Sequence, residues 1–67
     1  MKILFNSQPR EVAEGGLLAQ LLGELGLAQR RGVAVAVNDA VVPRSAWQNH
    51  QLADNDRVLV IQATQGG

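Results

Sequence analysis

The sequence predicts an α+β fold, in which a mixed sheet of four to five strands is covered on one face by a single main helix. Two observations lead to this prediction. Short β-branched runs at Val33–Val37 and Val58–Ile61 are typical of strands, and leucines from Leu17 to Leu25 recur at helical spacing. The chain has 67 residues, 46% of them apolar. A chain of this length forms one small domain, and a well-patterned core can hold it.

The first thirteen residues predict a β-hairpin. In the segment Met1–Asn6, alternate side chains are apolar, so that Met1, Ile3 and Phe5 share one face. Turn-forming residues follow from Asn6 to Pro9. We expect Arg10–Ala13 to return as a short second strand.

The leucine-rich segment predicts the main helix. Its apolar positions fall on one stripe, and Gly26 stands where a glycine would end the helix. The preceding Gly15-Gly16 is followed by Leu17-Leu18, whereas a phosphate-binding loop needs lysine and serine or threonine there. We therefore expect these glycines to be a hinge into the helix.

The second half predicts a further hairpin and a helical turn. Val33–Val37 is expected to be a strand, Asn38–Ala40 a tight turn, and Val41-Val42 an edge strand that Pro43 ends. Ser45–Gln48 matches a capping box and predicts a short helical turn, with Trp47 closing the core.

The last strand is predicted at Arg57–Ala63, after a turn at Asp54–Asp56 that lacks the glycine and glutamate of a calcium loop. The first and last strands are apolar on both faces, which favours their pairing as parallel central neighbours. Since one helix covers one face, Leu59, Ile61 and Leu4 are expected to point away from it. Exposed apolar side chains beside a terminus predict a surface for docking partners.

Composition argues against several classes of function. Without cysteine, the chain has no disulfide, thiolate metal site or catalytic thiol. His50 is the single histidine, and we expect it to lie at the surface. Zero net charge and two aromatic residues disfavour nucleic-acid binding. No apolar run approaches membrane-spanning length, and cytoplasmic location is expected. We expect no catalytic residues, bound metal or bound cofactor, and a monomer when the chain is free.

The C-terminal diglycine is the main functional signal. We expect residues 1–63 to form the domain and residues 64–67 to be a flexible tail, since glycines bury nothing and are costly to order. Thr64, Gln65 and Gly66 would thread a narrow slot in another protein and present the carboxylate of Gly67 there. The dipeptide alone favours a frayed end without function, and it is the rest of the chain that changes this balance.

The whole chain resembles the ThiS family, within the ubiquitin-like β-grasp superfamily. The resemblance lies in Ile3–Asn6, Val37–Asp39, Val42–Arg44 with Trp47, and the terminal diglycine. Further matches are Leu52, Asp54 and Asp56. The chain departs from the family pattern at Gly16–Leu18, which weakens the cap of the helix, and at Asn55, where family members usually have glycine.

The resemblance implies a sulfur carrier protein of thiamin biosynthesis. A C-terminal carboxylate is ionised at neutral pH and is a poor electrophile. The family implies that a ThiF-type enzyme adenylates Gly67, using ATP and magnesium. A persulfide derived from a cysteine desulfurase then yields a thiocarboxylate, whose sulfur passes to a ThiG-type thiazole synthase. The chain itself would be a carrier and co-substrate, not an enzyme.

Three alternatives remain open at the level of sequence. The small subunit of molybdopterin synthase is a sulfur carrier with the same tail chemistry, although the Val42–Arg44 and Trp47 pattern favours ThiS. A ubiquitin-like modifier would form isopeptide bonds, and a β-grasp adaptor would carry its tail without using it.

Overall fold

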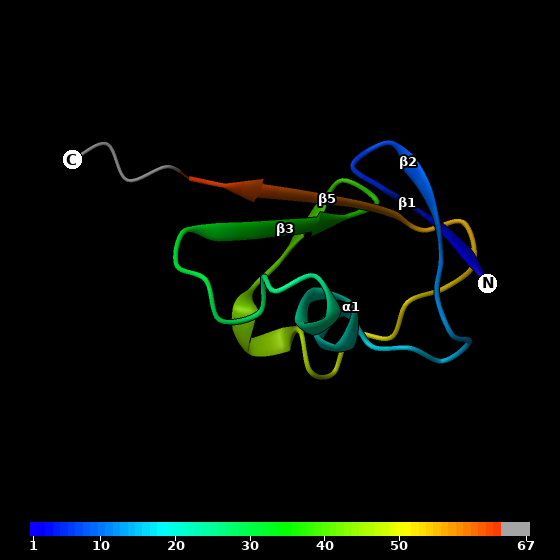
Figure 1. Ribbon diagram of the computed structural model, residues 1–67, viewed down its shortest axis with the longest axis horizontal. Helices are drawn as coiled ribbons and strands as arrows, with labels where there is room; N and C mark the ends of the chain where they lie inside the picture. The colour runs from blue at the N-terminus through cyan, green and yellow to red at the C-terminus, as the bar shows by residue number, and fades with distance from the viewer. Residues whose placement is uncertain (64–67) are drawn as a thin grey trace.

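A five-stranded sheet with one α-helix on one of its faces makes up the described part of the chain (Figure 1). The structure is a computed structural model, and it describes residues 1–63. The elements in chain order are β1 Lys2–Phe5, β2 Gln8–Glu11, α1 Leu18–Glu24, β3 Val33–Val37, β4 Ala40–Val42, the 3₁₀ helix η1 Arg44–Ala46, and β5 Arg57–Gln62.

The strand order is β2-β1-β5-β3-β4, with β1 and β5 parallel and every other neighbouring pair antiparallel. This confirms the predicted α+β fold with a mixed sheet and one main helix. It also confirms that the first and last strands are parallel neighbours. No helix within residues 1–63 is long and apolar enough to cross a membrane.

The first hairpin turns earlier than the sequence indicated. Asn6 and Ser7 both have positive φ, at 49° and 70°, and they form a two-residue turn that pairs Phe5 directly with Gln8. The predicted second strand at Arg10–Ala13 is therefore wrong in its bounds, because so tight a turn starts pairing at once. Pro9 is tolerated in β2 because this strand lies at the edge of the sheet.

Helix α1 ends as the sequence predicted. Gly26 has a φ of 73°, and its N–H donates to the carbonyl of Gly23. The N–H of Leu27 donates to the carbonyl of Leu22 at 2.8 Å. These two bonds form a Schellman motif, which satisfies carbonyls that the last turn leaves without helical partners. At the other end no side chain caps the helix, and the backbone N–H of Leu17 donates to Oε1 of Gln20.

The predicted capping box at Ser45–Gln48 is wrong. The helical turn is the 3₁₀ helix Arg44–Ala46, whose N-cap is Pro43 and which has no side-chain cap bond. Proline fixes the backbone as the chain leaves β4, so the turn begins before Ser45 can cap it. Trp47 is buried as expected, and its indole N–H donates to the carbonyl of Val42 at 2.9 Å. The guanidinium of Arg44 lies 4.6 Å from the centre of the Trp47 ring.

The core lies between α1 and the sheet face that α1 covers. It contains leucines of the helix, inward-facing residues of four strands, and two residues of the connection to β5. Its members are Ile3, Leu18, Leu21, Leu22, Val35, Val37, Val42, Trp47, Leu52 and Val58. Trp47 and Leu52 thus add to the core from the connection between β4 and β5.

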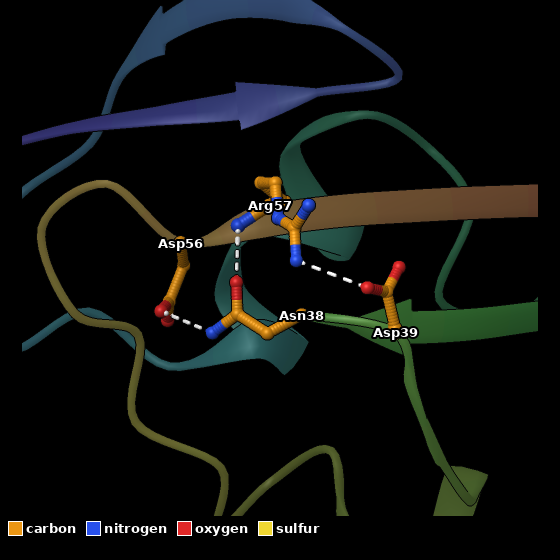
Figure 2. A network of polar contacts seen from close by, with 4 residues as sticks. All are labelled: Asn38, Asp39, Asp56 and Arg57. Atoms are coloured by element: carbon orange, nitrogen blue, oxygen red, sulfur yellow. Dashed lines mark hydrogen bonds and ion pairs between the residues drawn. The ribbon is translucent and has the colours of Figure 1, made fainter.

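A buried carboxylate joins the start of β5 to the turn between β3 and β4 (Figure 2). Asp56 is 9% exposed and accepts hydrogen bonds from the Asn38 side chain at 2.9 Å and the Ala53 N–H at 2.8 Å. The same Asn38 carboxamide accepts from the Arg57 N–H at 2.9 Å. Asn38 itself has a φ of 51°, as its predicted place in a tight turn requires.

Replacing Asp56 with alanine is expected to lower the free energy of unfolding by about 2 kcal/mol, because it leaves the donors of Asn38 and Ala53 without their partner. Urea unfolding followed by the fluorescence of Trp47, the single tryptophan, measures the change. The control is Asp39→Asn, which removes only an exposed ion pair with Arg57 and is expected to cost less than about 0.5 kcal/mol. Equal losses in the two variants would contradict the structural role of Asp56.

Candidate functional site

The alternation of side chains along β5 separates the core from an exposed apolar surface. Val58 is 1% exposed and faces α1, and Val60 is half-buried on the same side. Leu59 and Ile61 are 49% and 58% exposed and point away from α1. On the neighbouring strand, Leu4 is 37% exposed. The three residues predicted to dock partners therefore do lie exposed on one face, while their docking role stays a prediction.

Three further residues, which the sequence reasoning missed, extend this surface. Ala36 of β3 lies opposite Leu59 on one side and Val41 of β4 on the other. Val41 is 76% exposed, and Ala34 lies opposite Ile61. We call the combined surface the outer apolar face. Its residues are Leu4, Ala34, Ala36, Val41, Leu59 and Ile61. The signal in the sequence was the alternation of each strand, since inward Val35 and Val42 require outward neighbours.

Polar groups border the outer apolar face near the start of β5. A shallow hollow there is lined by Leu4, Asn6, Ala36, Asp39, Arg57 and Leu59, among others. The Arg57 guanidinium and the Asp39 carboxylate form an exposed ion pair at 3.0 Å, drawn in Figure 2. An apolar centre with a charged, solvent-exposed rim is the usual arrangement of a protein–protein interface.

Hydrogen bonds fix strand β5 at its middle and just past its end, on the side from which the predicted tail follows. The backbone N–H of Asn6 donates to the carbonyl of Val58, and the Asn6 side-chain oxygen accepts from the N–H of Val60, both at 2.8 Å. One residue past the strand, the N–H of Ala63 donates to the carbonyl of Gly32 at 2.8 Å. Gly32 has a φ of 74°, and a Cβ there would lie 3.1 Å from the Ala63 carbonyl oxygen. The backbone thus needs glycine at this close approach.

The predicted sulfur attachment point, Gly67, and the predicted threading residues Thr64, Gln65 and Gly66 lie outside the described residues. Their roles stay predictions, as does the division into a domain and a flexible tail. Within residues 1–63, no group of three histidine, cysteine, aspartate or glutamate side chains is placed to hold a metal ion. His50 is half-buried, and its carbonyl accepts from the N–H of Leu18.

Comparison with known protein families shows which family the chain belongs to. Residues 3–67 match the sequence model of the ThiS family. The chain belongs to the ThiS family. It is 40% identical to the sulfur carrier protein ThiS of Escherichia coli K12, over all of both chains.

Other relatives support this membership of the ThiS family. A crystal structure of ThiS from Geobacter metallireducens has a TM-score of 0.84 and 32% identity, with all of both chains covered. A solution structure of a thiamine biosynthesis protein from the same organism has a TM-score of 0.79 at 32% identity, with 88% of that chain covered. The chain is also 33% identical to a thiazole synthase of Paramagnetospirillum magneticum, but spans 20% of its length.

Adding a charge on β5 tests which of its faces is the outer one. Leu59→Glu is expected to change the free energy of unfolding by less than about 0.5 kcal/mol, because the side chain stays in water. Val58→Glu, at the adjacent buried position, is expected to cost about 4 kcal/mol or more and to unfold the domain. Thermal melts of the two variants measure the difference. Unfolding of the Leu59 variant would show that the outer apolar face is core.

Proposed function

We propose that this ThiS-family protein is a sulfur carrier of thiamin biosynthesis, and that it carries sulfur as a thiocarboxylate on Gly67. The observation that supports this most strongly is the match over full length to the sulfur carrier protein of Escherichia coli. The matching region of the family extends to Gly67 and so includes the diglycine. The fold supports the proposal as well, since β5 leads directly toward the tail.

The chemistry requires activation of the Gly67 carboxylate. As an anion it resists attack by a nucleophile, so it first attacks the α-phosphorus of ATP, releasing pyrophosphate and forming an acyl adenylate. A persulfide sulfur then attacks the acyl carbon, and AMP leaves with one former carboxylate oxygen. Cleavage of the acyl disulfide by a second thiol leaves the thiocarboxylate. The ThiF-type enzyme would bind ATP and magnesium and supply the catalytic groups. This chain would supply the carboxyl group and the surfaces that position it.

A thiazole synthase is the proposed acceptor of the sulfur. The similarity of the whole chain to a segment of the Paramagnetospirillum magneticum thiazole synthase supports this partner. A carrier-like segment joined covalently to such an enzyme is held at high effective concentration beside it. A separate carrier needs a binding surface to reach the same arrangement, and the outer apolar face is the surface we propose.

Intact mass spectrometry tests the carrier function. Incubation with ATP, magnesium, a ThiF-type enzyme and a persulfide donor is expected to raise the mass of the chain by the difference between a sulfur and an oxygen atom. Deletion of Gly67 is expected to abolish both this gain and ATP–pyrophosphate exchange, because it withdraws the carboxylate by about 3.5 Å. Its melting temperature is expected to be unchanged, since the buried core of the described residues 1–63 lies between Ile3 and Val58.

Two results would contradict the carrier function. The first is a shortened protein that exchanges at the rate of the full chain, because Gly67 would then not be the activated residue. The second is the formation of lysine-linked adducts on other proteins without any gain of sulfur, which would instead indicate a protein modifier.

The docking role of the outer apolar face has its own test. Leu59→Glu and Ile61→Glu are each expected to weaken binding to the ThiF-type enzyme by about tenfold or more, because a carboxylate must be desolvated in the interface. Gln48→Glu is the control, since it adds the same charge at an exposed position away from this face. Titration calorimetry measures the affinities, and equal affinities for all three variants would contradict the role.

A further inference from the structure

Strand β5 has an open edge immediately before the tail. On its β3 side it is paired over its length, from Val37↔Val58 to Val33↔Gln62, with a further bond at Ala63. On its other side, β1 pairs only through Leu4↔Arg57 and Phe5↔Val58. In Figure 1, β5 continues past the end of β1 with β3 alone beside it.

The direction of each backbone group on this edge follows from the bonds already described. The Val58 carbonyl and the Val60 N–H both point toward β1, where they meet the backbone N–H and the side-chain oxygen of Asn6. Because peptide groups alternate along a strand, the Val60 carbonyl and both groups of Gln62 point to the same side. β1 has turned away at Asn6 and Ser7, so among residues 1–63 no strand pairs with these three groups.

The Asn6 side chain has a specific part in this arrangement. If the parallel ladder of β1 and β5 continued, the Val60 N–H would donate to the backbone carbonyl of Asn6. The Asn6 Oδ1 takes that bond instead, at 2.8 Å, while the positive φ of Asn6 directs the backbone into the turn. The Asn6 side chain thus makes the last contact of β1 with β5. No backbone of β1 runs beside Val60–Gln62, so this edge of β5 stays accessible.

We infer that the ThiF-type adenylating enzyme adds an extended segment of its own chain to this open edge, at Val60–Gln62, when it takes up the Gly67 carboxyl group. This inference rests on the proposed function. Four residues follow Ala63, and an extended chain of four spans at most about 14 Å. The protein that reacts with Gly67 must therefore lie against this end of β5. An added strand would bond to the three backbone groups that no strand of residues 1–63 pairs with, and its side chains would alternate between the Ile61 side and the Val60 side.

Proline at position 62 removes one backbone donor from this edge while leaving the β3 ladder intact. The bonds to β3 come from Arg57, Ala63 and the alternate residues between them, so within residues 1–63 the Gln62 N–H takes no part in the sheet. Gln62→Ala keeps the N–H and is the reference. Relative to it, Gln62→Pro is expected to lower kcat/KM for ATP–pyrophosphate exchange by about tenfold, with no change in melting temperature. Equal kcat/KM values for the two variants would overturn the inference alone.

Amide hydrogen exchange of the unsubstituted protein tests the same edge without a variant. The Gln62 N–H is expected to exchange rapidly in the free protein and at least about tenfold more slowly in the complex with the enzyme. An unchanged exchange rate would overturn the inference, and protection that rises with protein concentration without enzyme would assign the edge to a second copy. If the unsubstituted protein supports no pyrophosphate exchange, the proposed function fails and the inference fails with it.

Discussion

The parallel pairing of β1 with β5 is the constraint on which the rest of the structure depends. The N–H groups of Leu4 and Asn6 donate to the carbonyls of Asp56 and Val58, which joins the two ends of the domain at the middle of the sheet. Parallel neighbours need a long crossover, and here it contains the α-helix and the β3–β4 hairpin. Once this pairing is fixed, Ile3 and Val58 face α1 together, and Leu59 and Ile61 must face away.

An exposed apolar face is a consequence of the size of the fold. Helix α1 has seven residues and is about 10 Å long, so it covers part of one sheet face and none of the other. A longer chain could place a second layer over the outer apolar face. In the described part of this chain, only side chains of the sheet itself occupy it. An apolar surface of this kind is stabilised by a partner, which is why the fold and the proposed docking role are physically connected.

Local patterns in the sequence predicted most of the elements, and long-range polar contacts account for what was missed. The leucine stripe, Gly26 and the β-branched runs act within a few residues, and each led to a correct element. The Asn6 side chain bonds to a residue 54 positions away, and Asn38 bonds to one 18 positions away. No local pattern indicates such partners. The predicted bounds of β2 and the predicted start of η1 were wrong for local reasons. The positive φ of Ser7 tightens the first turn, and Pro43 starts the helical turn one residue early.

The candidate docking residues could be predicted because successive side chains of a strand point to opposite faces, whatever the strand packs against. Leu59 and Ile61 followed from Val58 once β5 was known to have one buried face. The same alternation places Ala34 and Ala36 on this face once Val35 and Val37 are assigned to the core, but their positions opposite Ile61 and Leu59 depend on the register of β3 with β5. The open edge was also beyond sequence reasoning, since it arises where β1 ends relative to β5 and not from any residue type in β5 itself.

Three contacts fix the position of β5, and with it the end of β5 that adjoins the outer apolar face. Asp56 with Asn38 holds its start, Asn6 holds its middle at Val60, and Gly32 holds Ala63 just past its end. A partner that binds the outer apolar face therefore also receives Ala63 at a defined position. If the proposed reaction at Gly67 orders the four residues after Ala63, the backbone entropy cost is about 1–2 kcal/mol for each of them and does not include β5 itself. Under the proposed function, the contacts that hold β5 and Ala63 would therefore lower the entropy cost of delivering the Gly67 carboxyl group to a partner.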